Sequence, residues 1–333
     1  MTAFAMMRAQ NMSRQRHLGR SRILRKISPP KGGKHRTQTC AGGIMKQMEA
    51  AAQRATRSDG HGERRVYQPT NGRARLTAVL DDVRRGLELS RLSVALGWLD
   101  IKLRYRGSIL GPFWLTLSTA VMIAALGVLY ARLFHMPFRE YLPFLSISLV
   151  MWSFISTVWG EGAMIFVDNA GLILSSDVPF TVYITRAVIR NFIVMAHNVV
   201  VIAVVFYLCD VTPRNDPLIL AGFALWFIDS LAVMTLLGVL GARFRDVGPT
   251  IATVLQIFFF ITPVMWKPEL AHSMEPWLIY NPFYPLIEIV RLPAMGQALP
   301  IRIWEVAMIH SAILMVVAFL IFVRFRARLA YWV

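Results

Sequence analysis

The feature that most constrains this chain is an abrupt change from charged to apolar residues between Trp98 and Trp114. Four charged residues fall between positions 100 and 106, and no charged residue follows Arg106 until Arg132. About 20 apolar residues in a helix cross the hydrocarbon core of a bilayer, so the uncharged stretch is long enough to do so. Basic residues beside a span favour the cytoplasmic side. The sequence therefore predicts that the chain enters the membrane from the cytoplasm near Gly107.

The composition is typical of a protein that spans the membrane several times. The 333 residues are 56% hydrophobic, with a mean hydropathy of +0.49. Residues 1–85 hold 19 Lys and Arg against 5 Asp and Glu, so +14 of the net charge of +17 lies there. The near-neutral remainder suits lipid and argues against nucleic acid as a partner. Cys40 and Cys209 form neither a disulfide framework nor a metal-binding spacing.

Residues 1–75 are rich in Arg, Gly, Ser and Gln, and we expect a disordered basic tail in the cytoplasm. They hold no apolar run long enough for a signal peptide. Binding of RNA or anionic lipid by this tail is an alternative. A further alternative is that native translation starts at Met45 or Met48, because nothing earlier has a structural pattern.

Residues 84–106 are expected to form an amphipathic helix with two apolar stripes. At 100° per residue, two sets of apolar side chains fall on roughly opposite sides: Leu89, Leu92, Leu96, Leu99 and Leu103 on one, and Leu87, Val94, Trp98, Ile101 and Tyr105 on the other. Charged strips lie between them, one of which holds Ser93, Asp100 and Arg104. We expect one apolar stripe to face the bundle or lipid and the other a second protein. The alternative is a basic helix lying on anionic lipid.

The rest of the chain predicts an all-α membrane protein with six transmembrane helices. We expect these within residues 108–323, at 108–131, 141–162, 186–208, 217–241, 249–266 and 303–323. An even number of spans puts both termini on one side. The bias of basic residues, including those of the tail 324–333, places that side in the cytoplasm.

Residues 268–303 contain six prolines, which cut an otherwise apolar segment into pieces too short to span. Non-helical backbone is tolerated at membrane depth where protein covers it. We expect two short re-entrant helices that enter the outer leaflet. The alternative is a loop that lies flat on the headgroups.

No catalytic or metal-binding motif is present in the sequence. Asp229 is the only formal charge deep in a predicted span, so either a function or a partner in the bundle, His197 or Asn198, is expected for it. We interpret His197 and His310 as packing residues rather than a proton relay. Glu161 and Glu288 are expected at opposite membrane edges. We therefore expect another chain to supply the energy for transport. We expect no cofactor in this chain.

Several motifs, in order between residues 84 and 333, carry a family resemblance: Trp98–Trp114, Asn169-Ala-Gly-Leu-Ile-Leu174, Arg243-Phe-Arg-Asp246, Phe260-Ile-Thr-Pro-Val-Met-Trp266 and Asn281-Pro-Phe-Tyr-Pro-Leu-Ile-Glu288 with Arg291. The chain resembles the membrane subunit of an ABC-2 type exporter, of the branch that exports O-antigen, capsule or teichoic-acid polysaccharide. Residues 1–75 match nothing in that family. The resemblance implies a homodimer in the inner membrane with two separate ATPase subunits, which would bind ATP and Mg²⁺. It also implies a polyprenyl-linked glycan as cargo, moved from cytoplasm to periplasm.

The resemblance also assigns roles to residues. Residues 84–106 would be the interface helix, and the segment around 168–174 the coupling helix that docks on the ATPase. The expected coupling residues are Arg91, Asp168, Asn169, Gly171, Leu172 and Ile173. The expected periplasmic gate residues are Trp277, Tyr280, Pro282, Phe283, Tyr284, Glu288 and Arg291.

A sugar polymer in a channel needs aromatic faces against its C–H surfaces. Candidate channel residues are Phe113, Trp114, Tyr130, Trp152 and Trp159, with Phe154 nearby. Trp152 and Trp159 are seven residues apart and should share one helix face, as a rail for sugar stacking. The alternative is an aromatic belt or packing.

Three other functions remain possible from the sequence. An ABC-2 exporter of a drug, haem or simple lipid would share the same architecture. A membrane-embedded glycan-modifying enzyme would need a cluster of His, Asp and Arg at one membrane face, which the sequence does not display. A proton-coupled carrier would need more intramembrane charges than Asp229 alone.

Overall fold

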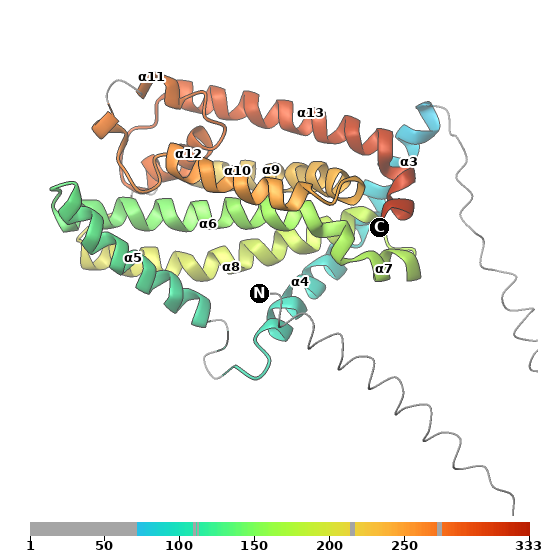
Figure 1. Ribbon diagram of the computed structural model, residues 1–333, viewed down its shortest axis with the longest axis horizontal. Coiled ribbons are helices and arrows are strands. Elements are labelled where there is room, and N and C mark those ends of the chain that lie inside the picture. The colour runs from blue at the N-terminus through green and yellow to red at the C-terminus, as the bar shows by residue number, and fades with distance from the viewer. Residues whose placement is uncertain (1–71, 109–110, 112, 214–216, 272–274) are drawn as a thin grey trace, which may run out of the picture. The chain divides into compact units, whose positions relative to one another are not determined.

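The computed structural model describes residues 72–108, 111, 113–213, 217–271 and 275–333, which belong to one compact unit. Within these ranges every regular element is a helix, as predicted (Figure 1). Most of the predicted tail 1–75, with Met45 and Met48, lies outside the described residues. The four residues 72–75 are described, and they are already helical.

The amphipathic segment forms two helices rather than the single helix predicted at 84–106. Helix α3 covers Gly72–Glu88 and α4 covers Ser90–Arg104, with a turn at Leu89 between them. The first helix begins before residue 84 because it has a buried face of its own, formed by Val79, Asp82 and Gly86 at helical spacing. It packs against α8 and α13.

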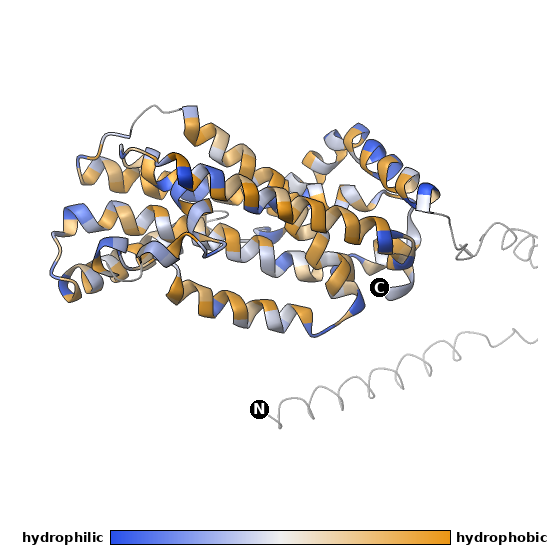
Figure 2. Ribbon diagram, turned by 90° about the horizontal axis from the view of Figure 1, so that it is seen from above, coloured by the Kyte–Doolittle hydropathy of each residue, from blue (hydrophilic) through white to orange (hydrophobic). Residues whose placement is uncertain are grey.

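Five helices of the described part are long and apolar enough to cross a membrane. They are α5 (Phe113–Leu133), α6 (Phe138–Asp168), α8 (Phe180–Leu208), α9 (Pro217–Arg243) and α13 (Ile301–Trp332). Figure 2 shows that these helices are hydrophobic along most of their length. They correspond to five of the six predicted spans.

The predicted span at 249–266 is a shorter helix, α10 (Val247–Ile261), of 15 residues. At 1.5 Å per residue it is about 22 Å long, below the ~30 Å hydrocarbon core. The helix ends because Thr262 precedes Pro263 and adopts an extended conformation with ψ 137°, since the proline ring disfavours the helical conformation of the residue before it. Helix length therefore supports five of the six predicted spans, and α10 is too short to be counted as a full-length span.

Helix α6 is the centre of the bundle. It packs against α5, α8, α9, α10 and α12. In an apolar 18-residue segment of this helix 78% of the residues are buried, whereas in the corresponding segment of α5 only 11% are buried. Small residues bring α6 and α9 close together. A Cβ atom added at Gly241 of α9 would lie 1.7 Å from the carbonyl oxygen of Ala163 on α6. The two backbones are therefore in direct contact, and glycine is required at this position.

The proline-rich segment contains a 3-10 turn, η2 (Pro268–Ala271), and two helices, α11 (Glu275–Leu278) and α12 (Tyr284–Ala294). Helix α12 packs against α6, α9 and α13, and its residues 285–291 are buried. Burial against three helices is contrary to a loop lying flat on headgroups. The re-entrant character of the segment stays a prediction.

The two ends of the bundle carry different elements. Helices α3, α4 and α7 (Ala170–Ser175) lie with the C-terminus at one end, which we call the α4/α7 end (Figure 1). The turn between α5 and α6 and the short helix α11 lie toward the opposite end. Residues 169–174 and 84–106, predicted as two separate contact regions, thus lie at the same end.

Candidate functional site

Helix α7 presents two leucines to the exterior at the α4/α7 end. The side chain of Asn169 donates a hydrogen bond to the carbonyl oxygen of Ile165 at 2.7 Å where α6 ends. Ile173 is buried, and α7 contacts α13. Leu172 and Leu174 are 49% and 64% exposed. This short helix is therefore anchored on one side and offers an apolar surface on the other.

The remaining predicted coupling residues are also exposed at this end. Asp168 is exposed beside α7, and Arg91 is exposed on α4. A Cβ atom at Gly171 would meet no atom within 4 Å, so a larger residue fits there without disturbing the fold. The coupling role of these residues stays a prediction.

The face of α4 that contacts the bundle is mixed in character, and neither predicted apolar stripe as a whole lies against the bundle. Ser93, Gly97 and Ile101 are buried, and α4 packs on α8. A Cβ at Gly97 would lie 3.0 Å from the carbonyl oxygen of Arg186, so glycine permits the close approach. Most of the apolar side chains of both predicted stripes are instead 37% to 54% exposed, among them Leu89, Leu92, Val94, Trp98, Leu99 and Leu103.

An ionic network explains why Asp100 turns inward. Arg186 of α8 donates to Asp100 with Nε at 2.7 Å and with a second nitrogen. Arg190 bridges Asp100, at 3.3 Å, and Glu161 of α6, at 2.6 Å. Asn191 also donates to Glu161, at 2.8 Å. Charge-assisted bonds of this kind are stronger than neutral ones, and this chain of pairs connects α4 to α8 and α6.

Asp82 fastens α3 in a similar way. Its side chain is fully buried and accepts hydrogen bonds from the backbone nitrogen and hydroxyl of Thr181, at 3.0 and 2.7 Å. Arg326 of α13 donates to the same carboxylate at 2.7 Å. The acid thus caps the N-terminus of α8, where the helix dipole favours a negative charge. The sequence analysis did not single out Asp82. The pattern that could have indicated it is an acidic residue at helical spacing between Val79 and Gly86.

The candidate channel aromatics differ in their exposure and contacts. Phe113 and Trp114 are 69% and 57% exposed on α5. Tyr130 is partly buried and its ring stacks on Phe134 at 5.5 Å. The channel role of these three residues stays a prediction.

Trp152 and Trp159 do share one face of α6, because both rings contact Phe283, at 5.3 and 5.0 Å. Trp152 also contacts Phe259 at 5.7 Å and is 7% exposed. Phe154 points to the neighbouring side and stacks on Trp226 at 5.4 Å. Little of the Trp152 ring is accessible in this arrangement, and its role in sugar stacking stays a prediction.

The predicted gate residues divide into an exposed and a buried group. Trp277 and Tyr280 are 71% and 75% exposed, with their rings 6.1 Å apart. Pro282 and Tyr284 are partly buried, and Phe283 is buried among aromatic rings. Their common role in a gate stays a prediction.

Glu288 and Arg291 form a buried ion pair on α12, and the location of Glu288 at a membrane edge stays a prediction. Each side chain is 2% exposed, and Nε of Arg291 donates to Glu288 at 3.2 Å. Arg291 also donates to the hydroxyl of Ser148 and the carbonyl oxygen of Pro263, both at 2.7 Å, and lies over the Phe144 ring. A buried pair requires such additional hydrogen bonds.

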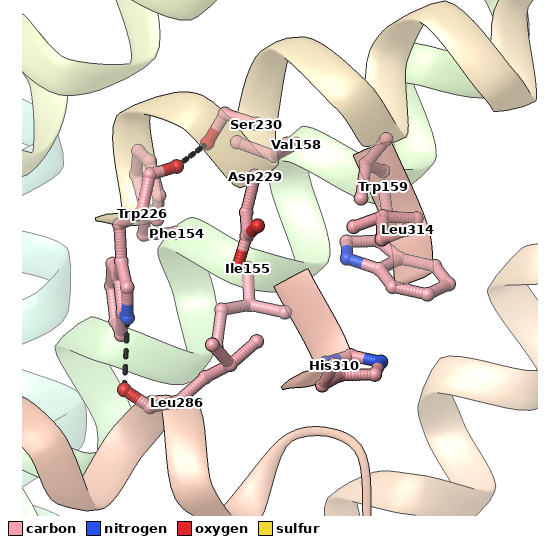
Figure 3. A pocket seen from close by; sticks show the side chains of 11 residues that line it. Phe154, Ile155, Val158, Trp159, Trp226, Asp229, Ser230, Leu286, His310 and Leu314 are labelled. Carbon is pink, nitrogen blue, oxygen red and sulfur yellow. Dashed lines mark hydrogen bonds between the residues drawn. The ribbon is translucent and has the colours of Figure 1, made fainter. Parts of the chain in front are cut away.

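Asp229 is buried in the bundle, but its partner is neither His197 nor Asn198. The hydroxyl of Ser311 on α13 donates to it at 2.8 Å. His197 instead contacts the carbonyl oxygen of Ile193 on its own helix, at 2.7 Å. Asp229 lines a small cavity with His310 (Figure 3). In the part of the chain that the structure describes, no group of three acids, histidines or cysteines is placed to hold a metal.

No family model matches the chain. It is similar to proteins named as O-antigen export permeases. A protein named O-antigen export system permease protein RfbA from Klebsiella pneumoniae is 23% identical over 237 residues, 69% of this chain and 90% of the relative. One of the same name from Myxococcus xanthus is 26% identical over 215 residues, 62% of this chain and 80% of the relative. The similarity therefore extends over most of the length of those permeases, and it agrees with the series of apolar helices.

Proposed function

We propose that this chain is the transmembrane permease subunit of an ATP-driven exporter of O-antigen or a related surface polysaccharide. The observation that carries the proposal is the similarity to O-antigen export permeases over 80% to 90% of their length. Five long apolar helices in the described part support a multi-pass membrane location. ATP and Mg²⁺ would be bound by a separate ATPase subunit, and this chain would hydrolyse nothing.

The proposed coupling surface is the α4/α7 end. Closure of two ATPase subunits would push on the exposed leucines of α7 and on α4. Because Asp100 of α4 is bonded to Arg186 and Arg190 of α8, and Arg190 to Glu161 of α6, a displacement of α4 would be passed to two spans. Both termini would be cytoplasmic, with α11 and α12 near the periplasm.

The proposed assembly is a homodimer in the inner membrane. Helix α5 exposes large apolar side chains on most of its surface, which requires lipid or a second copy to cover it. The cargo would be a polyprenyl-linked glycan that moves from the cytoplasm to the periplasm between the two copies. Trp277 and Tyr280 would lie at its exit.

The test is reconstitution with the ATPase subunit and measurement of ATP hydrolysis with and without the lipid-linked glycan. We expect the two chains to purify together and the glycan to stimulate hydrolysis. Stimulation by a short-chain lipid but not by the glycan would favour a simple-lipid exporter. Transport by this chain without an ATPase would contradict the proposal.

The coupling surface is tested by the double variant Leu172→Glu, Leu174→Glu. We expect a loss of at least about tenfold in glycan-stimulated hydrolysis, as when ~1.4 kcal/mol of interface energy is lost. The charge reversal Arg91→Glu and the bulky change Gly171→Trp should act in the same direction. Arg132→Glu, an exposed reversal at the opposite end, is the matched control. Full stimulation in all coupling variants would refute the assignment.

A further inference from the structure

In the middle of a span, one carboxylate oxygen of Asp229 has no partner among the described residues. The side chain lies on α9 and is 5% exposed. Its Oδ2 accepts the bond from Ser311 at 2.8 Å, while Oδ1 is buried and has no hydrogen-bond partner among the described residues. A buried carboxylate oxygen left in this way is costly, and its persistence calls for a ligand.

A second unpartnered group faces the same space. His310 precedes Ser311 on α13, and its Nδ1 is also buried without a partner in the described part of the chain. Asp229 and His310 both line one cavity, which Figure 3 shows between α6, α9, α12 and α13. The two groups come from helices that are far apart in the sequence.

The size and lining of the cavity limit its occupant. The volume open to a water-sized sphere is about 30 Å³, above the ~10–15 Å³ that one water molecule needs in the same measure. The hydroxyl of Ser230 already donates to the Trp226 carbonyl at 2.7 Å, and the Trp226 indole donates to the Leu286 carbonyl at 2.8 Å. Of the other lining side chains, Trp159 carries an indole N–H and the rest are apolar. Bound Ca²⁺ and Mg²⁺ need about six or more oxygen ligands, which these residues do not supply, and no group of three possible metal ligands occurs among the described residues.

We propose that one buried water molecule occupies this cavity and bridges Asp229 to His310. The water donates one hydrogen to Oδ1 of Asp229 and forms its second hydrogen bond with Nδ1 of His310. With the direct bond from Ser311, it gives α9 and α13 two adjacent polar connections. Because hydrocarbon offers no replacement hydrogen bonds, the bridge holds these helices in a single register next to α12. Asp229 and His310 are positioning residues in this account.

The first test is infrared difference spectroscopy of the full chain in lipid nanodiscs, exchanged between H₂¹⁶O and H₂¹⁸O. We expect an O–H stretching band of an isolated, hydrogen-bonded water that shifts with the isotope. The band should be lost in His310→Phe and retained at a changed frequency in Asp229→Asn, which keeps an acceptor. His197→Phe, which removes another histidine of a span, is the matched control and should leave the band unchanged.

The second test is a double-mutant cycle on the unfolding midpoint of the same nanodisc-embedded chain. Asp229→Asn and His310→Phe should be non-additive, because both single changes disrupt the same bridge. Asp229→Asn and His197→Phe should be additive. The proposal would be overturned if the infrared band persisted in His310→Phe, was lost in His197→Phe, or was absent from the unchanged protein. It would also be overturned if Asp229→Asn and His310→Phe were additive. The proposal does not depend on the transported substrate, so failure of the export assay would leave it unaffected.

Discussion

The α4/α7 end and helix α12 both contain paired acids and arginines, but they use them differently. Asp82 and Asp100 bind arginines that lie 244 and 86 positions away, on other helices. Glu288 and Arg291 are three residues apart on one helix, and both are almost fully buried. The first arrangement fastens separate elements with partly exposed arginines; the second neutralises charge inside the core. Disruption should therefore detach a helix at one site and destabilise the whole bundle at the other.

The largest effect is expected for Arg291→Met, which leaves Glu288 as an uncompensated buried charge. Breaking a buried pair from one side costs ~3–5 kcal/mol in the free energy of unfolding. The measurement is the unfolding midpoint of the purified chain. The double variant Glu288→Gln, Arg291→Met should recover part of the loss because no charge is left behind. A single variant as stable as the parent would show that this pair is not buried.

A smaller but sharply localised effect is expected for Asp82→Asn. The change weakens the bonds to Arg326 and to the N-terminus of α8, for which ~1.5–3 kcal/mol is typical of charged hydrogen bonds. Hydrogen exchange should accelerate in α3 and leave α6 unchanged. Asp81→Asn is the matched control, since its side chain is 62% exposed. Equal exchange in both variants would contradict the fastening role of Asp82.

Asp100→Asn should have a more modest effect, because its arginine partners are partly solvated, with side chains 22% and 17% exposed. We expect a loss of ~1–2 kcal/mol after discounting for solvent screening. Exchange should increase in α4 while α3 stays protected by Asp82. Increased exchange in both helices would instead indicate that α3 and α4 detach as one unit.

The smallest effect is expected for Glu88→Ala. Its pair with Arg84 spans one helical turn and the two side chains are 61% and 79% exposed. Such surface pairs contribute within ~0.5 kcal/mol. The unfolding midpoint should not change measurably. A large shift would mean that another surface covers this part of α3.

Much of the fold could be predicted because spans are specified by local composition. The charge-free stretch after Arg106 predicted α5 from neighbouring residues alone. The early end of α10 could also have been predicted from the sequence, because Thr262 precedes Pro263. Our prediction of a span to residue 266 did not take this local signal into account. The difference between α5 and α6 was not readable, because their hydropathy is similar and only packing separates them.

What the sequence did not predict concerned long-range partners. Hydropathy left open whether a stripe of α4 faces the bundle or lipid, whereas Asp100 turns inward because α8 supplies Arg186 and Arg190. Asp229 was assigned partners from α8, but the partner is Ser311, 82 residues away on α13. Periodicity identifies which residues share a face, and it does not identify which helix that face meets.

The contact at Gly241 limits how this molecule can move. Because the backbone of α9 touches the Ala163 carbonyl of α6, a Cβ atom at position 241 would clash with that oxygen. We therefore expect α6 and α9 to move together as one unit. Under the proposed function, we expect changes of shape at the more exposed α5 and at the ion-paired contacts of α3 and α4.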